Sequence, residues 1–484
     1  MSRRDQRNGT RGSRRAPRRV AIWAPTVLVV GVLGVAVAAD HFAWGPRYLG
    51  WTSDAVSDGP VAAPEILGLG AVPTAPAVAD EAPEAALDAA AIRKATRSAL
   101  RDDSLGKHVV SLVATLDGTP VFSSGDDRLT PASTAKILTG VAALETLGPD
   151  HRFTTSVEVG ADVDEIVLVG GGDPYLRAEP APNGSFPEQA DLTTLAFETA
   201  TALTERGTTS VKLSYDASLF TGPADNPEWE AGYVGEEVVS PISALWVDRG
   251  VDPDSGRRVP DSAAAAAQVF ADALEKRGVS VSGPQSGEVA ADAEVLASVD
   301  SAPVSQIVER VLEVSDNEGA EVLSRHVGIA VEDDGSFVAG SESVLSTLTE
   351  LGVDVSGDVL LDGSGLSRKN HLSATTLVAA LALAASDDDP RLRPAIDGLP
   401  VAGFTGSLNS RFDVAADDGL GKVRAKTGTL TGVHVLAGIT TDAAGVPMLF
   451  VVGADKVPVE KTLQARATLD QFAAALAGCV CSPS

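Results

Sequence analysis

The sequence predicts an α+β fold: a domain with an antiparallel sheet and helices, interrupted by an inserted region. A hairpin pattern and a helix pattern lie near the start of the folded part, within residues 88–154. Three consecutive strand patterns and a closing helix pattern lie at its far end, within residues 296–478. The stretch between them, residues 155–295, has short strand patterns and at least two helix patterns of its own. This arrangement indicates one domain that carries an insertion of one or two small α/β domains.

The composition is that of a globular and strongly acidic protein. The 484 residues are 44% hydrophobic and 21% charged, which excludes wholesale disorder, and the formal net charge is −28. So acidic a chain repels a phosphate backbone, and we expect no nucleic-acid partner. Six scattered histidines without an H-E-x-x-H motif form no metal-ligand pattern, which argues against a metallohydrolase. We interpret the two cysteines, Cys479 and Cys481, as incidental rather than as a disulfide framework.

The N-terminus has the pattern of an export segment. Eight arginines lie within residues 1–19, and an uncharged run follows over residues 20–39. Twenty helical residues can just span a bilayer core, and the basic flank favours a cytoplasmic position. Ala36-Val37-Ala38 resembles a cleavage site, so the run predicts a membrane anchor or a signal peptide, and its length favours the anchor. Either way the rest of the chain lies outside the cytoplasm, beginning with an Ala/Pro-rich tether over residues 40–87.

The folded part opens with a helix pattern over residues 92–101. A valine-rich, partly alternating stretch over residues 108–116 predicts a strand, and Asp117-Gly118 is a hairpin-turn signal before the return strand. Thr130-Pro131 then favours a helix start, because proline is well tolerated in a first turn. We expect that helix to run to about Leu147.

The inserted region and the last part of the chain are interpreted in the same way. In the inserted region, apolar spacing indicates helices over residues 192–205 and 263–276 and a strand over residues 210–215. In the last part we expect helices over residues 303–314, 318–330, 373–385 and 460–477, and strands over residues 421–430, 433–440 and 446–452.

Ser133-Thr134-Ala135-Lys136 is the first element with catalytic potential. At a helix start, residues i and i+3 share a face, which brings the Lys136 amine within reach of the Ser133 hydroxyl. The partial positive charge of the helix N-terminus would also stabilise an oxyanion. An isolated S-x-x-K match is more often a cap and a solvated lysine. A second copy, residues 104–107, contains a glycine and precedes a strand, where no such pairing is enforced.

Ser315-Asp316-Asn317 lies between two predicted helices. These residue types favour turns and caps, so an inter-helix turn is the plain interpretation. In the catalytic interpretation the Ser315 hydroxyl relays protons and the Asn317 amide holds a substrate carbonyl. Ser407-Leu408-Asn409 has the same spacing, but it follows the helix over residues 373–385 and lies close to the third element, so we prefer Ser315.

Lys426-Thr427-Gly428-Thr429 is the third element, and it contains the only K-[ST]-G of the chain. It lies late in a predicted strand, where Gly428 permits close backbone approach. Lys426 and Thr427 could bind a carboxylate. By itself this motif would be an ordinary strand end.

The three elements together match, in order and setting, the S-x-x-K, S-D-N and K-T-G set of β-lactamases and penicillin-binding proteins. The chain therefore resembles the penicillin-recognising serine enzymes. Within them it is similar to the D-alanyl-D-alanine carboxypeptidase/endopeptidase family, the class C low-molecular-mass penicillin-binding proteins. The likeness covers about residues 90–480 and extends to Phe153-Thr154-Thr155, Pro241–Leu245, Asp362–Ser367, Leu399–Gly403 and Ala425–Gly438.

The resemblance implies a penicillin-binding, β-lactamase-like transpeptidase domain, with extra domains in the 182 residues from Ser133 to Ser315. It implies that Ser133 attacks a D-Ala-D-Xaa bond in a peptidoglycan stem peptide and forms an acyl-enzyme. Lys136 would accept the proton, Ser315 would pass it to the leaving amine, and Asn317 would hold the substrate amide. This mechanism would require no metal and no organic cofactor.

By the same resemblance, Lys426, Thr427 and Thr429 would bind the terminal carboxylate, and the backbone N–H groups of Ser133 and Thr429 would form the oxyanion hole. β-Lactam antibiotics would inhibit by acylating Ser133, and the protein would act in the cell-wall space. Membrane attachment would be through residues 20–39 if these are not cleaved.

Two alternatives stay open at this point. A β-lactamase would use the same motifs, but the long gap and the lack of a Glu-x-x-Leu-Asn stretch between the first two elements weaken it. A non-catalytic wall-binding or antibiotic-sensing module would keep the fold, although it need not keep the whole set of motif residues.

Overall fold

The computed structural model describes residues 85–162, 164–412 and 415–482. The basic segment over residues 1–19, the anchor or signal peptide over residues 20–39 and nearly all of the tether lie outside the described residues. Within the described part of the chain, no helix has the length and apolar character needed to cross a bilayer.

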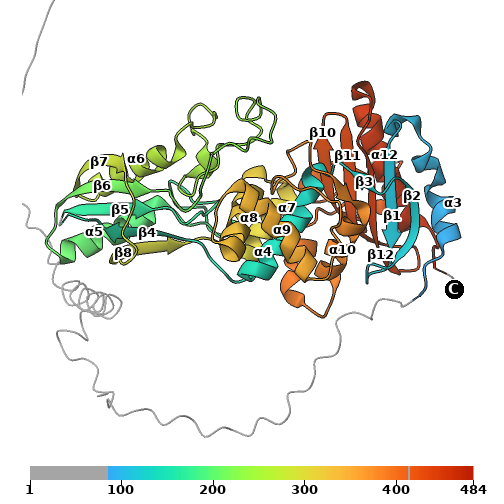
Figure 1. The fold of residues 1–484 in the computed structure, drawn as a ribbon, viewed down its shortest axis with the longest axis horizontal. Coiled ribbons are helices and arrows are strands. Elements are labelled where there is room, and N and C mark those ends of the chain that lie inside the picture. Colours follow the sequence, from blue (N-terminus) through green and yellow to red (C-terminus); the bar gives the residue numbers. More distant parts are fainter. Residues whose placement is uncertain (1–84, 163, 413–414, 483–484) are drawn as a thin grey trace, which may run out of the picture. The chain divides into compact units, whose positions relative to one another are not determined.

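A five-stranded antiparallel sheet is built from the two ends of the folded chain (Figure 1). Its strands, in spatial order, are β10 (Arg424–Leu430), β11 (Val433–Thr441), β12 (Pro447–Ala454), β1 (Val109–Ala114) and β2 (Pro120–Gly125). The C-terminal strands thus continue the sheet begun by the N-terminal hairpin. The α+β prediction is confirmed, with β10 at one edge of the sheet.

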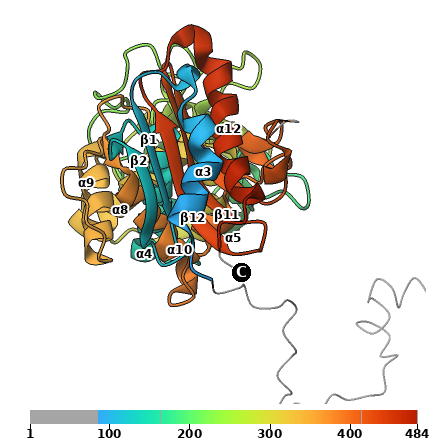
Figure 2. The same cartoon turned by 90° about the vertical axis from the view of Figure 1, so that its right-hand side faces the viewer.

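Helices cover both faces of this sheet. On one face α3 (Ala89–Leu100) and α12 (Thr462–Gly478) lie side by side (Figure 2), and on the other lie α4 (Lys136–Leu147) and α10 (Ala374–Ala385). The residues of β12 alternate between the faces, as strand geometry requires. Leu449 and Val451 join the core that contains α4 and α10, whereas Met448, Phe450 and Val452 join the core under α3 and α12.

Three further helices complete the layer around α4. They are α7 (Val304–Val314), α8 (Asn317–Glu332) and α9 (Phe337–Glu350). Helix α9 was not predicted from the sequence; Ser336 caps it, and it buries Val344 and Leu348 against the same core. Short elements in this layer are β3 (Arg128–Leu129), which pairs with β9 (Leu372–Ser373), and α11 (Pro394–Asp397).

The chain between α4 and α7, residues 148–303, is called here the intervening segment. It forms a second five-stranded sheet in the order β7 (Ser280–Ser286), β6 (Ser210–Asp216), β5 (Glu165–Val169), β4 (Thr154–Val159) and β8 (Val295–Asp300). β5, β6 and β7 are parallel, whereas β4 pairs antiparallel with both β5 and β8. The expected helices appear as α5 (Leu192–Glu205) and α6 (Ser262–Glu275), which share a separate hydrophobic core with this sheet.

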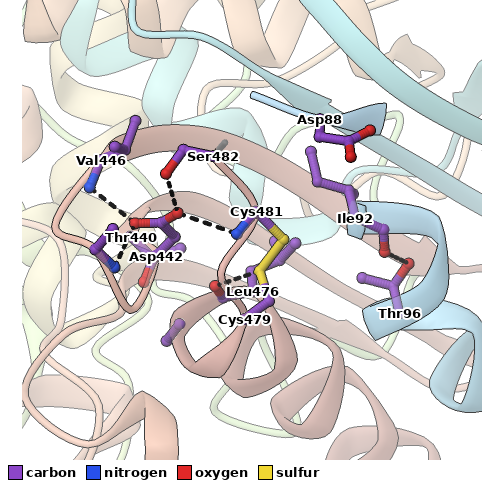
Figure 3. Close-up of a disulfide and its surroundings, with 12 residues drawn as sticks. Asp88, Ile92, Thr96, Thr440, Asp442, Val446, Leu476, Cys479, Cys481 and Ser482 are labelled. Carbon is purple, nitrogen blue, oxygen red and sulfur yellow. Dashed lines mark hydrogen bonds between the residues drawn. A yellow bond between two sulfur atoms is a disulfide. The ribbon is translucent and has the colours of Figure 1, made fainter. Parts of the chain in front are cut away.

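The two cysteines are joined by a disulfide just after α12 (Figure 3). The interpretation of these cysteines as incidental missed this bond, which depends on how the tail folds back. The Asp442 carboxylate accepts hydrogen bonds from the Cys481 N–H at 3.1 Å and from the Ser482 hydroxyl at 2.8 Å. The Cys481 carbonyl accepts from the Asp88 N–H at 2.6 Å, so the tail is held against the start of α3. With the tail so held, Cys481 lies buried beside Cys479.

Candidate active site

Ser133 lies in a tight 3-10 turn, η2 (Ala132–Ala135), and α4 begins only at Lys136. The prediction that the α-helix begins at Thr130-Pro131 was wrong in this detail. Ala132 has a φ of 46°, in the left-handed region that a right-handed helix cannot include. The turn and the helix follow one another directly, so Ser133 and Lys136 still face each other.

Two glycines from distant segments let the backbone on either side of this turn pack closely. A Cβ at Gly428 in β10 would lie 2.4 Å from the Pro131 carbonyl oxygen. A Cβ at Gly365 would lie 1.9 Å from the Ala132 carbonyl oxygen, and Gly365 has a φ of +82°. Only glycine fits at either position without displacing the turn that carries Ser133.

The Lys136 amine is at the centre of the site. Its Nζ lies 3.1 Å from Ser133 Oγ, 2.8 Å from Asn317 Oδ1 and 2.7 Å from the Ser364 carbonyl oxygen. These three acceptors come from η2, from the first turn of α8 and from the loop after α9. The structure therefore brings together the first two predicted motifs through a single side chain.

The environment of Lys136 makes it easier to deprotonate than an ordinary lysine. The side chain is fully buried, and this burial lowers its pKa to about 8. Nearby carboxyl groups oppose this shift, those of Glu321, Asp362, Asp316 and Glu318. A lysine with a pKa near the working pH can exchange a proton with a neighbouring hydroxyl.

Ser315-Asp316-Asn317 forms the sharp turn between α7 and α8. Ser315 ends α7 in a left-handed conformation with φ 61° and ψ 43°, and its side chain is half-buried. Asp316 caps α8 by accepting from the Gly319 N–H at 3.1 Å. Asn317 is the first residue of α8, and its Nδ2 donates to the Val238 carbonyl at 3.0 Å. With both ends of its amide engaged, Asn317 is held in one orientation.

The K-T-G element lies on the edge strand β10. Lys426 is fully buried, and burial together with the charge of Lys136 lowers the pKa of Lys426 well below the ordinary value of a lysine. Thr427 is nearly buried, and its hydroxyl lies 2.8 Å from the hydroxyl of Ser407. Thr429 is exposed on the strand, opposite His434 of β11.

The loop over residues 362–367, which was not predicted as part of the site, supports Lys136. The Glu321 carboxylate accepts from the Gly363 and Ser364 N–H groups at 3.1 and 2.8 Å, which holds the Ser364 carbonyl against Lys136. Asp362 accepts from the Ser367 N–H at 2.6 Å. Burial raises the pKa of Glu321 to about 7 and also raises that of Asp362. Asp362–Ser367 is one of the family-like stretches, but nothing in its residue types predicts this supporting role.

The second copies of the S-x-x-K and S-x-N patterns, at residues 104–107 and 407–409, do not surround Lys136 as the first copies do. Ser104 is buried, and its hydroxyl hydrogen-bonds with that of Thr468 at 3.1 Å rather than with Lys107 of its own motif. Ser407 does reach the site, but beside Thr427 rather than beside Lys136. In the described part of the chain, no group of three His, Cys, Asp or Glu side chains is placed to hold a metal ion.

Comparisons with solved structures identify the class of fold. Penicillin-binding protein 4 from Haemophilus influenzae superposes with a TM-score of 0.64 at 21% sequence identity, covering 80% of this chain and 98% of that one. A second crystal structure of that protein, in complex with a β-lactam, gives a TM-score of 0.60. The fold is that of a penicillin-binding protein.

Comparisons of sequence identify the family. Residues 92–253 and 251–476 match the D-Ala-D-Ala carboxypeptidase 3 (S13) family. A carboxypeptidase of Mycobacterium tuberculosis is 35% identical over 427 residues, covering 87% of this chain and 89% of the relative. A D-alanyl-D-alanine carboxypeptidase of Actinomadura sp. is 32% identical over 409 residues, covering 69% and 75%. The chain belongs to the S13 family.

Proposed function

We propose that the protein is a serine D-alanyl-D-alanine carboxypeptidase/endopeptidase that acts on peptidoglycan stem peptides outside the cytoplasm. The observation that carries the proposal is the position of Lys136, whose amine reaches both Ser133 and Asn317. The family and the names of its relatives support the substrate class. The export pattern of residues 1–39 supports the location, with residues 20–39 as a membrane anchor if they are retained.

Ser133 is the nucleophile of this proposal. Neutral Lys136 removes the proton of the Ser133 hydroxyl as the oxygen attacks the carbonyl of a D-Ala-D-Xaa bond. The acyl-enzyme forms, Ser315 delivers a proton to the leaving amine, and water then hydrolyses the ester. Asn317 binds the substrate amide and keeps Lys136 in place, and no metal or organic cofactor takes part.

The terminal carboxylate of the substrate is bound by β10. Lys426, Thr427 and Thr429 provide the donors, with the substrate lying along the outer edge of β10 like an added strand, beyond the bridge between Val401 and Arg424. The N–H groups of Ser133 and Thr429 stabilise the oxyanion. Penicillin acylates Ser133 because its strained amide mimics the same dipeptide.

Intact-mass spectrometry of the full chain with benzylpenicillin tests this function, with Ser133→Ala as the matched variant. We expect a stable adduct of one equivalent on the wild type and none on Ser133→Ala, and release of D-Ala from a D-Ala-D-Ala peptide. Fast consumption of the drug without an adduct would identify a β-lactamase instead. No adduct, no consumption and no D-Ala release would identify a non-catalytic binding module.

A further inference from the structure

Three consecutive residues at the start of α8 are all tied to the intervening segment. The Asp316 carboxylate lies 3.2 Å from Arg249 Nη1. The Asn317 amide donates to the Val238 carbonyl at 3.0 Å. The Glu318 carboxylate lies 2.8 Å from Arg258 Nη2. Asn317, the residue that contacts Lys136, is therefore flanked by two carboxylates, each paired with an arginine from residues 148–303.

Both carboxylates are buried and depend on these partners. The side chains of Asp316 and Glu318 are 1% and 4% exposed. Asp316 also accepts from the Tyr175 hydroxyl at 3.3 Å, and Glu318 from the Ser240 N–H at 3.1 Å. A buried carboxylate that loses its cation is strongly destabilised, so the first turn of α8 would have to move.

The two arginines are themselves held in place by the intervening segment. Arg249 lies in a turn, Asp248–Gly250, whose three residues all have positive φ. The Arg249 carbonyl accepts from the buried Ser240 hydroxyl at 2.6 Å, which fixes the turn. Arg258 also donates to the Glu237 carbonyl at 3.2 Å. Non-glycine residues with positive φ persist only where their surroundings hold them, and such strain is often found near functional sites.

We infer that the intervening segment contributes to the geometry of the active site. Its residues Arg249 and Arg258 are positioning residues, which hold the Ser315–Asn317 turn against Lys136. This inference rests on the proposed function. It assigns a role to a segment in which the sequence shows no catalytic motif. Neither arginine reaches Ser133 in this arrangement; both act through α8.

The arginines also shape the charge around Lys136. The charged groups that face Lys136 come from three elements. They are Asp316, Glu318 and Glu321 of the first turns of α8, Asp362 of the loop over residues 362–367, and Lys426 of β10. Asp316 is faced in turn by Arg249, Tyr175 and Arg310. Without Arg249, the Asp316 carboxylate still accepts from Gly319 and Tyr175 and still has Arg310 nearby, but it loses its ion pair. An anion near Lys136 that has lost its ion pair favours the charged amine and raises the pKa of Lys136.

The test measures the second-order rate constant of benzylpenicillin acylation as a function of pH for the full chain. Arg249→Gln and Arg258→Gln are compared with Arg257→Gln, an exposed neighbour whose side chain makes no hydrogen bond or ion pair with α8 among the described residues. We expect a loss of roughly 10- to 100-fold near neutral pH for the first two variants, the scale of a small misplacement of a reacting group. Arg257→Gln should stay within about twofold of the wild type.

The pH profile separates positioning from a merely structural effect. In Arg249→Gln the acid limb should move to higher pH, because Lys136 then loses its proton less easily. A structural defect alone would lower the rate equally at every pH. Arg249→Lys, which keeps the charge, should restore the position of the acid limb even if the rate is only partly rescued.

A double-mutant cycle tests whether Arg258 acts through Glu318. If it does, Glu318→Gln combined with Arg258→Gln should be no slower than Arg258→Gln alone. The inference would be overturned if the wild type is acylated and both arginine variants show the same acylation rate and the same position of the acid limb as the wild type. Lack of a wild-type adduct would refute the proposed function itself, and the inference with it.

Discussion

Replacing Gly428 with alanine tests how closely β10 must approach the turn that carries Ser133. The added Cβ would lie 2.4 Å from the Pro131 carbonyl oxygen and 3.3 Å from the Ala132 Cβ. A close carbon–oxygen contact is about 3.3 Å, so one side must retreat by about 0.9 Å. Both partners are backbone, in a strand and in a tight turn, so neither can yield by rotating a side chain.

The expected loss of acylation rate follows from which groups this movement displaces. Either the K-T-G strand or the Ser133 turn is displaced, and each carries groups that must meet the same substrate. A misplacement of about 1 Å costs roughly 100-fold in rate, which corresponds to about 2.8 kcal/mol in the activation free energy. We therefore expect Gly428→Ala to lower the rate of acylation by benzylpenicillin about 100-fold.

Time-resolved mass spectrometry of the penicilloyl adduct provides the assay. Gly287→Ala is the matched control, since a Cβ there would find its nearest neighbour, Ser214 Cβ, at 3.5 Å. The control should acylate like the wild type, and both variants should give native circular dichroism. An acylation rate for Gly428→Ala within about threefold of the wild type would refute the reasoning that this close approach positions the nucleophile.

Three further expectations follow from the same structure. Burial lowers the pKa of Lys136 to about 8, and only the neutral form of Lys136 accepts a proton. The acylation rate should therefore fall about tenfold per pH unit below pH 8. An acylation rate that does not change with pH in a stopped-flow series would contradict this. Ser407→Ala removes the 2.8 Å contact with the Thr427 hydroxyl. It should raise KM for a D-Ala-D-Ala peptide about two- to tenfold, the equivalent of one hydrogen bond. An unchanged KM would show that this contact does not contribute to substrate binding. Replacing both Cys479 and Cys481 with serine should lower the free energy of unfolding by about 1.5 kcal/mol, as expected for so short a loop. The acylation rate should not change, because the disulfide lies outside the site. A folded variant that is no longer acylated would contradict the expectation that the disulfide stabilises the fold alone.

The motif residues of the candidate site could be picked out from the sequence because each belongs to a short pattern of residue types. Ser133 and Lys136 are three positions apart, so a single turn makes them neighbours wherever the helix lies. Lys426 belongs to a short motif of consecutive residues, which can be recognised without knowledge of the fold. Even here the local geometry escaped prediction, since the left-handed Ala132 places Ser133 in a 3-10 turn rather than in the α-helix.

The supporting residues could not be predicted in the same way. Glu321, Arg249 and Arg258 are ordinary charged residues in an acidic chain, and nothing in their neighbours along the sequence separates them from solvated ones. Their roles arise from burial and from partners tens or hundreds of positions away. Ser407 has the spacing of the second motif, yet its partner in the structure, Thr427, follows only from the tertiary fold.

The sequence by itself determined the fold class, the order of the three motifs and the chemistry that their side chains offer. These properties depend on residue type, short spacing and hydrophobic period, all of which are local. Only the tertiary structure decided which groups surround Lys136, how far burial lowers its pKa and what the intervening segment contributes to the site. Those properties depend on desolvation and on contacts between distant segments, and no local pattern encodes either of them.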